Sequence, residues 1–402
     1  MQLGLKTALR RFFAHGGRAR SKEVLRFGSC LRRIEEGRPG LGSFRTGSSL
    51  EVFTASTSFA SSSSSGFRAS GLGSGRGARA FSSLTAEAVD EDFEEMDPSL
   101  VYVHNAECVP YPHESAKDFL VQGKRGAYTG ARSVDSSAVF EFEAHVERLA
   151  KSAALMLESE REEKGRLENL GRFEDFLSSD SLRPKVAESM GAGMSRFKEC
   201  NGGDVEMKIT LLLTWEPSDE GGDFDIFTLV TPLGDRPAQP VKVQIGGKPR
   251  KNALAKDSEW ARQRRALELA MPEDCNEVIL KDDEGRLFEG LQTNFYVVKD
   301  NKVQTAGEGI LEGTVRKLLL EECEKESIDV DARPPSVQEM ESWQGCFISS
   351  TSRLLLPVSE IVYTTEDGVA KSKSFTPLDP LVLSLEKLIL DRYREESTTI
   401  LV

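Results

Sequence analysis

The sequence is poor in the residues that hold metals and disulfides. Its six cysteines are spread along 402 residues without a Cys-x-x-Cys pair, which argues against both a disulfide framework and a zinc site. Only four histidines occur, at His15, His104, His113 and His145, and none forms a His-Glu-x-x-His motif. We therefore expect free or buried thiols in a reducing compartment and no dedicated metal site.

Long apolar stretches and an excess of positive charge are missing as well. The longest apolar runs, such as ITLLLTW, are far shorter than the roughly 20 residues that span a membrane. The net charge is -13, and an acidic surface repels the phosphate backbone of nucleic acids. These absences predict a soluble protein that binds neither membrane nor nucleic acid. With 39% hydrophobic residues, the chain can bury a sizeable core, and its length suits about two domains.

Charge is distributed unevenly along the chain. Residues 1–81 carry 14 Lys and Arg against 4 Asp and Glu, which leaves 38 basic and 61 acidic residues for the rest. A basic segment rich in Arg and Ser and poor in acidic residues is typical of an organellar transit peptide. Because Arg79-Ala80-Phe81 resembles a mitochondrial processing site, we predict that residues 1–81 are a disordered transit peptide to the mitochondrial matrix. The serine content and the length of the segment leave the chloroplast stroma as the alternative, and a basic tail without an address as the simplest one.

The rest of the chain predicts an acidic flexible segment, 82–99, followed by two α/β domains, 100–236 and 237–402. The stretch LGDRPAQP, with its two prolines, reads as the linker between them. In the first domain we expect a buried strand at MKITLLLTW and a helix after His145, whose apolar residues recur on one face. In the second we expect strands at VKVQI, NEVILKD, GRLFEG, TNFYVVK, FISS and EIVYTT, and helices at 260–269, 313–326 and 380–390. Asp379 and Pro380 are typical of the start of the last helix.

Three features have the chemistry of a cofactor site, and each also has an ordinary structural explanation. Lys256 lies between apolar Ala253-Leu254-Ala255 and Trp260, where loss of solvation would lower its pKa and make the amine a nucleophile. Glu289 is a lone carboxylate at the end of a predicted strand. The helix after Gly313 offers unpaired N–H groups that suit a phosphate. Taken singly, they are equally a surface lysine, a turn carboxylate and an ordinary helix start.

Together these segments resemble the class IV aminotransferases, the fold-type IV enzymes that use pyridoxal 5′-phosphate (PLP). The family includes branched-chain and D-amino-acid aminotransferases and aminodeoxychorismate lyase. The resemblance covers roughly residues 126–358, in family order, and is carried by GAYTGAR with VFEFEAHVERLAKSA, EGLQTNFYVV, ILEGTVR and SSTSRLLLPV. AKDSEWARQRR is similar to a divergent eukaryotic, aminotransferase-like branch. The resemblance implies a two-domain α/β fold of the D-amino-acid aminotransferase type and a homodimer.

The resemblance also assigns residue roles. Lys256 would bind PLP covalently and move the proton at the substrate Cα, and Glu289 would hold the pyridine nitrogen. Four residues would bind the cofactor phosphate: Arg148, Thr314, Val315 and Thr351. Ser352 would face the substrate, and Arg353 would either meet the substrate carboxylate or point to solvent, which we favour slightly.

Two departures from the family pattern bear on function. No tyrosine follows Lys256 closely, and the phosphate loop reads Gly-Thr-Val where Gly-Ile-Thr is usual, which moves its hydroxyl by one residue. The resemblance implies a PLP-dependent transaminase of a small amino acid, branched-chain or D-type, with a 2-oxo acid acceptor. The alternatives are a PLP enzyme of folate synthesis similar to aminodeoxychorismate lyase, and a PLP-binding protein with little turnover. Retention of both Lys256 and Glu289 argues against the last.

Overall fold

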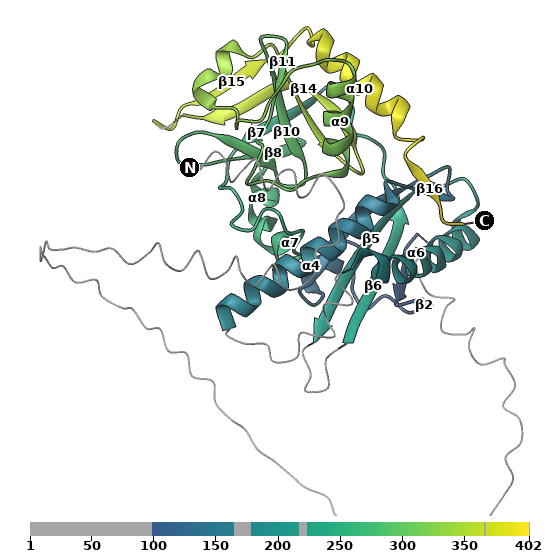
Figure 1. Ribbon diagram of the computed structural model, residues 1–402. Coiled ribbons are helices and arrows are strands. Elements are labelled where there is room, and N and C mark those ends of the chain that lie inside the picture. Colours follow the sequence, from purple (N-terminus) through teal and green to yellow (C-terminus); the bar gives the residue numbers. More distant parts are fainter. Residues whose placement is uncertain (1–98, 165–177, 217–222, 366, 402) are drawn as a thin grey trace, which may run out of the picture. The chain divides into compact units, whose positions relative to one another are not determined.

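The computed structural model describes residues 99–164, 178–216, 223–365 and 367–401 (Figure 1). The predicted transit peptide, and all of the acidic segment except its last residue, lie outside these ranges, so both stay predictions. The described chain holds two β-sheets with helices packed against them. No helix in these ranges is long and apolar enough to cross a membrane.

The first sheet has seven strands in the order β16-β4-β3-β5-β6-β1-β2. Its strands, all antiparallel to their neighbours, are β1 (Val101–His104), β2 (Glu107–Cys108), β3 (Ala127–Val134), β4 (Ala138–Phe140), β5 (Met207–Glu216), β6 (Asp223–Pro232) and β16 (Ser397–Thr399). The expected strand MKITLLLTW is β5. The last strand, β16, returns from the C-terminal end of the described chain to pair with β4.

Two long helices, α4 (Phe142–Lys164) and α6 (Ser179–Asn201), pack on this sheet and against each other (Figure 1). The predicted helix after His145 is confirmed as α4, and its apolar face is buried at Val146, Leu149 and Ala153. Sequence reasoning missed α6. This helix approaches β6 closely at Gly193, where a Cβ would come within 2.8 Å of a Val230 methyl carbon.

The second sheet has nine strands in the order β12-β11-β10-β13-β14-β7-β8-β9, and β15 pairs with β14. Its strands are β7 (Val241–Ile245), β8 (Glu277–Lys281), β9 (Leu287–Gly290), β10 (Asn294–Lys299), β11 (Lys302–Gln304), β12 (Val330–Asp331), β13 (Gly345–Ser350), β14 (Leu354–Thr364) and β15 (Ala370–Ser374). Because β9 also pairs with β10, through Glu289 and Asn294, six strands close into a ring around an apolar core.

Helices α9 (Thr314–Lys325) and α10 (Pro380–Arg392) cover a second apolar cluster on this sheet (Figure 1). The expected start of α10 is confirmed, because the Asp379 carboxylate accepts a hydrogen bond from the Leu381 N–H at 2.9 Å. The single helix predicted for 260–269 is instead two short ones, α7 (Glu259–Gln263) and α8 (Arg265–Ala270). Arg264 separates them with φ -76° and ψ -12°, a turn conformation between the two helical segments.

The segment around Lys256 pairs with the start of β3 and so links the two sheets. The Tyr128 N–H donates to the Lys256 carbonyl at 2.9 Å, and the Ser258 N–H donates to the Gly126 carbonyl at 2.9 Å. The Ser258 hydroxyl in turn accepts from the Gly126 N–H at 3.0 Å. Gly126 is required here, since any side chain at this position would collide with the Leu213 carbonyl. This junction places the lysine beside residues of the first sheet.

Candidate active site

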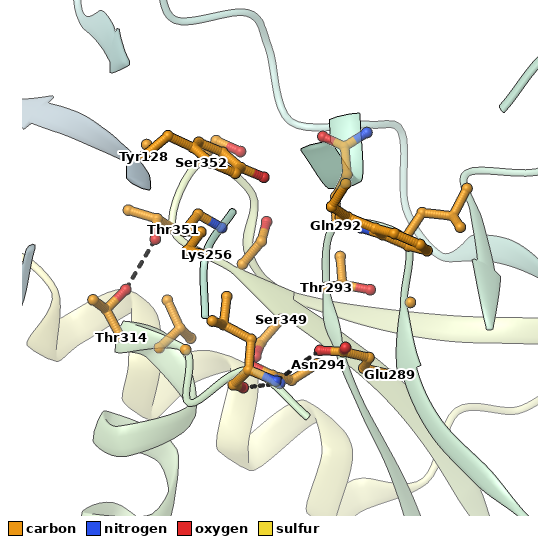
Figure 2. Close-up of a pocket in the computed structure, with 18 of the residues that line it drawn as sticks. Tyr128, Lys256, Glu289, Gln292, Thr293, Asn294, Thr314, Ser349, Thr351 and Ser352 are labelled. Carbon is orange, nitrogen blue, oxygen red and sulfur yellow. Dashed lines mark hydrogen bonds between the residues drawn. The ribbon is translucent and has the colours of Figure 1, made fainter. Parts of the chain in front are cut away.

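One pocket gathers most of the residues predicted for a cofactor site (Figure 2). Its walls come from β3, β5, α4, the Lys256 segment, the β9–β10 turn, the start of α9 and the β13–β14 turn. Seven of the eight predicted residues line it: Arg148, Lys256, Glu289, Thr314, Val315, Thr351 and Ser352. Arg353 is the exception. Among the described residues, no cluster of three His, Cys, Asp or Glu side chains is arranged to hold a metal ion.

Lys256 is held by its backbone on both sides and presents its amine to the pocket. Its N–H donates to the Ser152 hydroxyl at 3.0 Å, and its Nζ lies 4.8 Å from the centre of the Tyr128 ring. Burial lowers the pKa of Lys256 to about 8; the Tyr128 phenol opposes this shift, and the charges of Arg148, Arg250 and Arg264 add to it. A substantial fraction of the amine is therefore uncharged at mildly alkaline pH, as a nucleophile requires.

Glu289 is buried at the end of β9, where three donors hold its carboxylate. Arg250 donates to one oxygen through Nε at 2.8 Å and lies at 2.7 Å through Nη2, and the Leu311 N–H donates to the other at 2.9 Å. Burial raises the pKa of Glu289, while Arg250 and the Leu311 N–H act against this shift. Because three donors favour the charged form, Glu289 is an oriented anion at this end of the pocket.

Arg250 is a functional residue that sequence reasoning missed. Besides pairing with Glu289, it donates to the carbonyls of Ala253 at 3.0 Å and Ala255 at 3.4 Å, directly before Lys256. It thus ties the carboxylate to the lysine segment. The only sequence signal was its place six residues before Lys256, and the neighbouring Lys248 and Lys251 carry the same charge.

The opposite end of the pocket is rich in donors. The guanidinium of Arg148 is 9% exposed, and its Nη2 lies 2.7 Å from the Thr129 hydroxyl and 2.8 Å from His145 Nδ1. Its buried Nε has no partner among the described residues. Burial lowers the pKa of Arg148 to about 10, partly offset by Tyr128 and Glu141. An arginine with an unused donor, aimed into a pocket, is suited to an anion.

His145 serves Arg148. It is fully buried, and burial lowers its pKa well below the usual value, with the Arg148 charge adding to the effect. The ring is therefore neutral, and Nδ1 accepts from Arg148 and from the Thr129 hydroxyl, 2.8 Å away. This agrees with the structural role expected for His145.

The start of α9 faces the same end of the pocket. The first backbone hydrogen bond of this helix runs from the Lys317 N–H to the Gly313 carbonyl, so the N–H groups of Thr314 and Val315 precede the helical ladder. The Thr314 hydroxyl lies 2.9 Å from that of Thr351 (Figure 2). Although the Gly-Thr-Val order differs from the family pattern, its hydroxyl meets Thr351, while the Val315 side chain packs in the core.

Arg353 belongs neither to the pocket nor to solvent, so the preference for solvent is wrong. Its Nη1 donates to the Asn276 carbonyl at 3.2 Å and lies 3.6 Å from the buried carboxylate of Glu277. The turn that carries it reverses the chain direction between β13 and β14, which leaves Ser352 at the pocket and turns Arg353 behind it.

Tyr128 and Arg264 line the pocket and were also missed. The Tyr128 hydroxyl accepts from Arg264 Nη1 at 3.4 Å. Burial by itself would raise the pKa of Tyr128, but the charges of Lys256, Arg264 and Arg250 outweigh it and lower the pKa to about 8. Tyr128 thus brings a phenol next to Lys256 from β3. It was quoted only as part of the GAYTGAR motif, and sequence distance gave no reason to pair it with the lysine.

Comparison with known proteins points to one family. The sequence profile described as amino-transferase class IV matches residues 126–361. A probable branched-chain-amino-acid aminotransferase of Thermotoga maritima is 29% identical over 120 residues, which are 28% of this chain and 44% of the relative. A putative one of Methanocaldococcus jannaschii is 30% identical over 88 residues, 21% of this chain and 31% of the relative. The chain thus spans less than half the length of these curated relatives.

Solved structures give the same answer for the fold. The branched-chain aminotransferase of Thermoproteus uzoniensis with norvaline superposes with a TM-score of 0.56 at 17% identity, covering 75% of this chain and 99% of that one. A hypothetical aminotransferase from Mycobacterium tuberculosis in its PLP-bound form superposes with 0.53 at 20% identity, covering 73% and 98%. These likenesses confirm the predicted α/β two-domain fold of type IV.

PLP is the cofactor of this family, and the pocket fits it. An anion-binding end, formed by Arg148, the two threonine hydroxyls and the start of α9, suits a phosphate. The partly neutral amine of Lys256 suits an aldehyde, and the oriented Glu289 carboxylate suits a ring nitrogen. The unused Nε donor of Arg148 is a buried polar group that a phosphate oxygen would satisfy.

The lowered pKa of Lys256 makes the attachment of PLP dependent on pH. A folded-state pKa of about 8 means that the reactive neutral amine is lost as the pH falls through 8. When apoprotein is mixed with PLP between pH 6.5 and 9.5, on the order of one pH unit per tenfold change, the attachment rate should rise with pH and level off above about 8. Absorbance of the bound cofactor measures the rate.

Borohydride reduction and peptide mapping should then find the cofactor on Lys256. Lys256→Ala should remove the adduct, while Lys251→Ala, a change at an exposed neighbour, should leave it intact. Labelling of Lys248 or Lys251 in the wild type would show that the site is wrongly assigned.

Arg148 should bind the cofactor phosphate through its planar, forked donors. We expect Arg148→Ala and Arg148→Lys to weaken PLP binding roughly ten- to hundredfold, because a charge-assisted hydrogen bond is lost and lysine cannot reproduce the geometry. Titration of the apoproteins with PLP measures this. Lys151→Ala on the same helix removes only an exposed ion pair with Glu312 and should change affinity less than about twofold. Arginine variants that bind as tightly as this control would refute the phosphate role.

Proposed function

The chain belongs to the class IV aminotransferases, and from this membership we propose that it is a PLP-dependent transaminase that moves the amino group of a small aliphatic amino acid to a 2-oxo acid. The observation that carries the proposal is the meeting of Lys256 and Glu289 in one pocket with an anion-binding end. Either residue alone has an ordinary explanation. Their combination matches the aldehyde, ring nitrogen and phosphate of a single cofactor.

Each residue has a separate task in the proposed reaction. PLP, when bound, supplies an aldehyde for the amino group and a ring that withdraws electrons from the substrate Cα. Lys256 attacks as a neutral amine and, once displaced by the substrate, takes the proton from Cα and returns it. Glu289, held by Arg250, keeps a negative charge at the ring nitrogen. Arg148, Thr314 and Thr351 hold the phosphate and so fix where the substrate meets the lysine.

The remaining walls of the pocket support the choice of substrates. Leu120, Trp260 and Leu291 give the pocket an apolar side, which suits an aliphatic side chain. Lys208 and Arg264 give it cations for carboxylates. Structures with this fold hold 4-methylvaleric acid in a Thermus enzyme, and alpha-ketoglutarate with the aminated cofactor in the Mycobacterium protein. By likeness of fold, we take an aliphatic amino acid as donor and a dicarboxylic 2-oxo acid as acceptor.

The proposal includes an address and an assembly. The basic, acid-poor segment 1–81 supports import into the mitochondrial matrix, with the chloroplast stroma as the alternative. A homodimer is supported by the family resemblance and by two exposed leucines, Leu254 at 43% and Leu269 at 73%, on either side of the Lys256 segment. Both statements are part of the proposal and are tested with it.

A half-reaction screen tests the proposed activity. PLP-loaded protein is mixed in turn with L- and D-amino acids, while absorbance follows conversion of the cofactor to its aminated form. We expect conversion by aliphatic amino acids, reversal on adding 2-oxoglutarate, and no conversion by Lys256→Ala. Lys208→Gln should weaken 2-oxoglutarate more than a monocarboxylic 2-oxo acid, because only the former has a second carboxylate. Release of pyruvate from aminodeoxychorismate would instead identify a lyase, and no conversion by any compound would mean a binding protein.

The mature protein should start near Ser82 and carry two chains. Protein isolated from purified mitochondria should give an N-terminal peptide at or just after Phe81 by mass spectrometry, because Arg79 lies where the processing peptidase reads. Native mass spectrometry of the same sample should give twice the mass of the processed chain. Peptides from before Arg79, or a single-chain mass, would count against processing and dimerisation respectively.

A further inference from the structure

Two turns frame the pocket on the side away from the phosphate end. The first joins β9 to β10 and brings Leu291, Gln292 and Thr293 to the wall. The second joins β13 to β14 and brings Thr351 and Ser352. Figure 2 shows Gln292 and Thr293 on one side of the pocket and Thr351 and Ser352 on the other. The separation of the two turns sets the space left for a substrate.

Glu277, at the start of β8, holds the first turn from behind. Its carboxylate accepts from the Leu291 N–H at 3.1 Å and from the Gln292 N–H at 3.3 Å. The Leu291 N–H also reaches the Val278 carbonyl at 3.1 Å. Glu277 is 2% exposed, and a Cβ at Gly290 would come within 2.7 Å of its Cγ. The carboxylate is therefore locked against the turn and cannot move without moving it.

A buried carboxylate of this kind needs a cation, and Arg353 supplies it. Burial raises the pKa of Glu277, and Arg353 is the strongest of the groups that oppose this shift. Within the described residues, its Nη1, 3.6 Å from the carboxylate, makes the ion pair of Glu277. The same nitrogen donates to the Asn276 carbonyl at 3.2 Å, which fixes the guanidinium beside β8.

Arg353 is itself part of the second turn, and the backbone of that turn is held from the other side. The Arg353 carbonyl accepts from Arg236 Nε at 3.0 Å, and the Ser352 carbonyl accepts from Arg132 Nη1 at 3.3 Å. The Arg353 N–H donates to the Ser350 hydroxyl at 3.3 Å. With its backbone fixed, this turn can transmit a restraint through the Arg353 side chain.

We propose that Arg353 is a positioning residue that acts through Glu277, and that the pair ties the Leu291–Gln292 turn to the Thr351–Ser352 turn and thereby sets the width of the substrate end of the pocket. The proposal rests on the proposed transaminase function for its kinetic consequence only. Arg353 touches neither the cofactor end nor Lys256, so its loss should affect substrate binding rather than PLP.

Hydrogen exchange of the PLP-loaded protein tests the tie without any turnover. In Glu277→Gln and Arg353→Gln, the peptide that contains Leu291 and Gln292 should exchange roughly ten- to hundredfold faster than in the wild type, because charge-assisted hydrogen bonds are weakened. Arg353→Lys, which keeps the charge, should recover part of the protection. Arg333→Gln, which removes an exposed ion pair with Asp331, should leave this peptide unchanged. Unchanged exchange in both Gln variants would overturn the proposal.

Steady-state kinetics test the consequence for the substrate. In Arg353→Gln we expect the KM for the amino acid to rise about tenfold, with kcat and PLP affinity each within about twofold of the wild type. Adding Arg353→Gln to Glu277→Gln should change KM by less than about twofold, because one residue acts through the other. Equal losses in kcat and PLP affinity, or full additivity in the double variant, would contradict a positioning role.

The two failures are distinguishable. A wild-type protein that converts no amino acid would overturn the transaminase, and the exchange measurement would still decide whether the two turns are tied. A wild-type transaminase whose Arg353 variants keep both protection and KM would overturn the tie alone. Arg353→Lys covers the case in which Arg353→Gln does not fold.

Discussion

The site depends on a short stretch of backbone pairing between the Lys256 segment and the beginning of β3. Two main-chain hydrogen bonds and the Ser258 hydroxyl lock 132 residues of intervening chain into a loop, closed where Gly126 meets Ser258. Without this junction, the lysine, which belongs to the second half of the chain, would not lie beside Tyr128, and Arg148, which belongs to the first, would line a different surface. The bond Lys256 makes to Ser152 on α4 extends the same junction into the helix that carries Arg148.

The electrostatics of the pocket follow from gathering cations where water is scarce. Arg148, Arg250, Arg264 and Lys256 all line it, and Glu289 is the carboxylate among the lining residues. Each cation raises the cost of charging the next, which is why burial and neighbours act together on Lys256 and why a phenol beside them ionises more easily. An anionic cofactor relieves this crowding. The fold therefore holds a positively charged pocket ready for a phosphate instead of building it on binding.

Sequence patterns predicted the parts of the site that lie in short, recognisable segments, and the structure gathers those parts in one pocket. Lys256, Glu289 and the start of α9 each follow a local pattern, and α4 and α10 follow from periodicity and capping. Arg250, Tyr128 and the Arg353–Glu277 pair were not predicted, because their meaning lies in contacts between distant residues: Arg353 and Glu277 are 76 positions apart. The two short helices in place of one, and the missed α6, show that weak local periodicity is decided by packing.

The return of β16 to the first sheet has a consequence for the order in which the protein can be built. A ribosome releases β3 and β4 some 260 residues before Ser397–Thr399 appear, so the edge of β4 stays open during nearly all of synthesis. Glu141, which follows β4 and leads into α4, donates its N–H to the Glu396 carbonyl at 2.7 Å. The turn that starts the Arg148 helix is thus finished by the last segment to emerge, and the anion-binding end of the pocket reaches its final form only after translation of that segment.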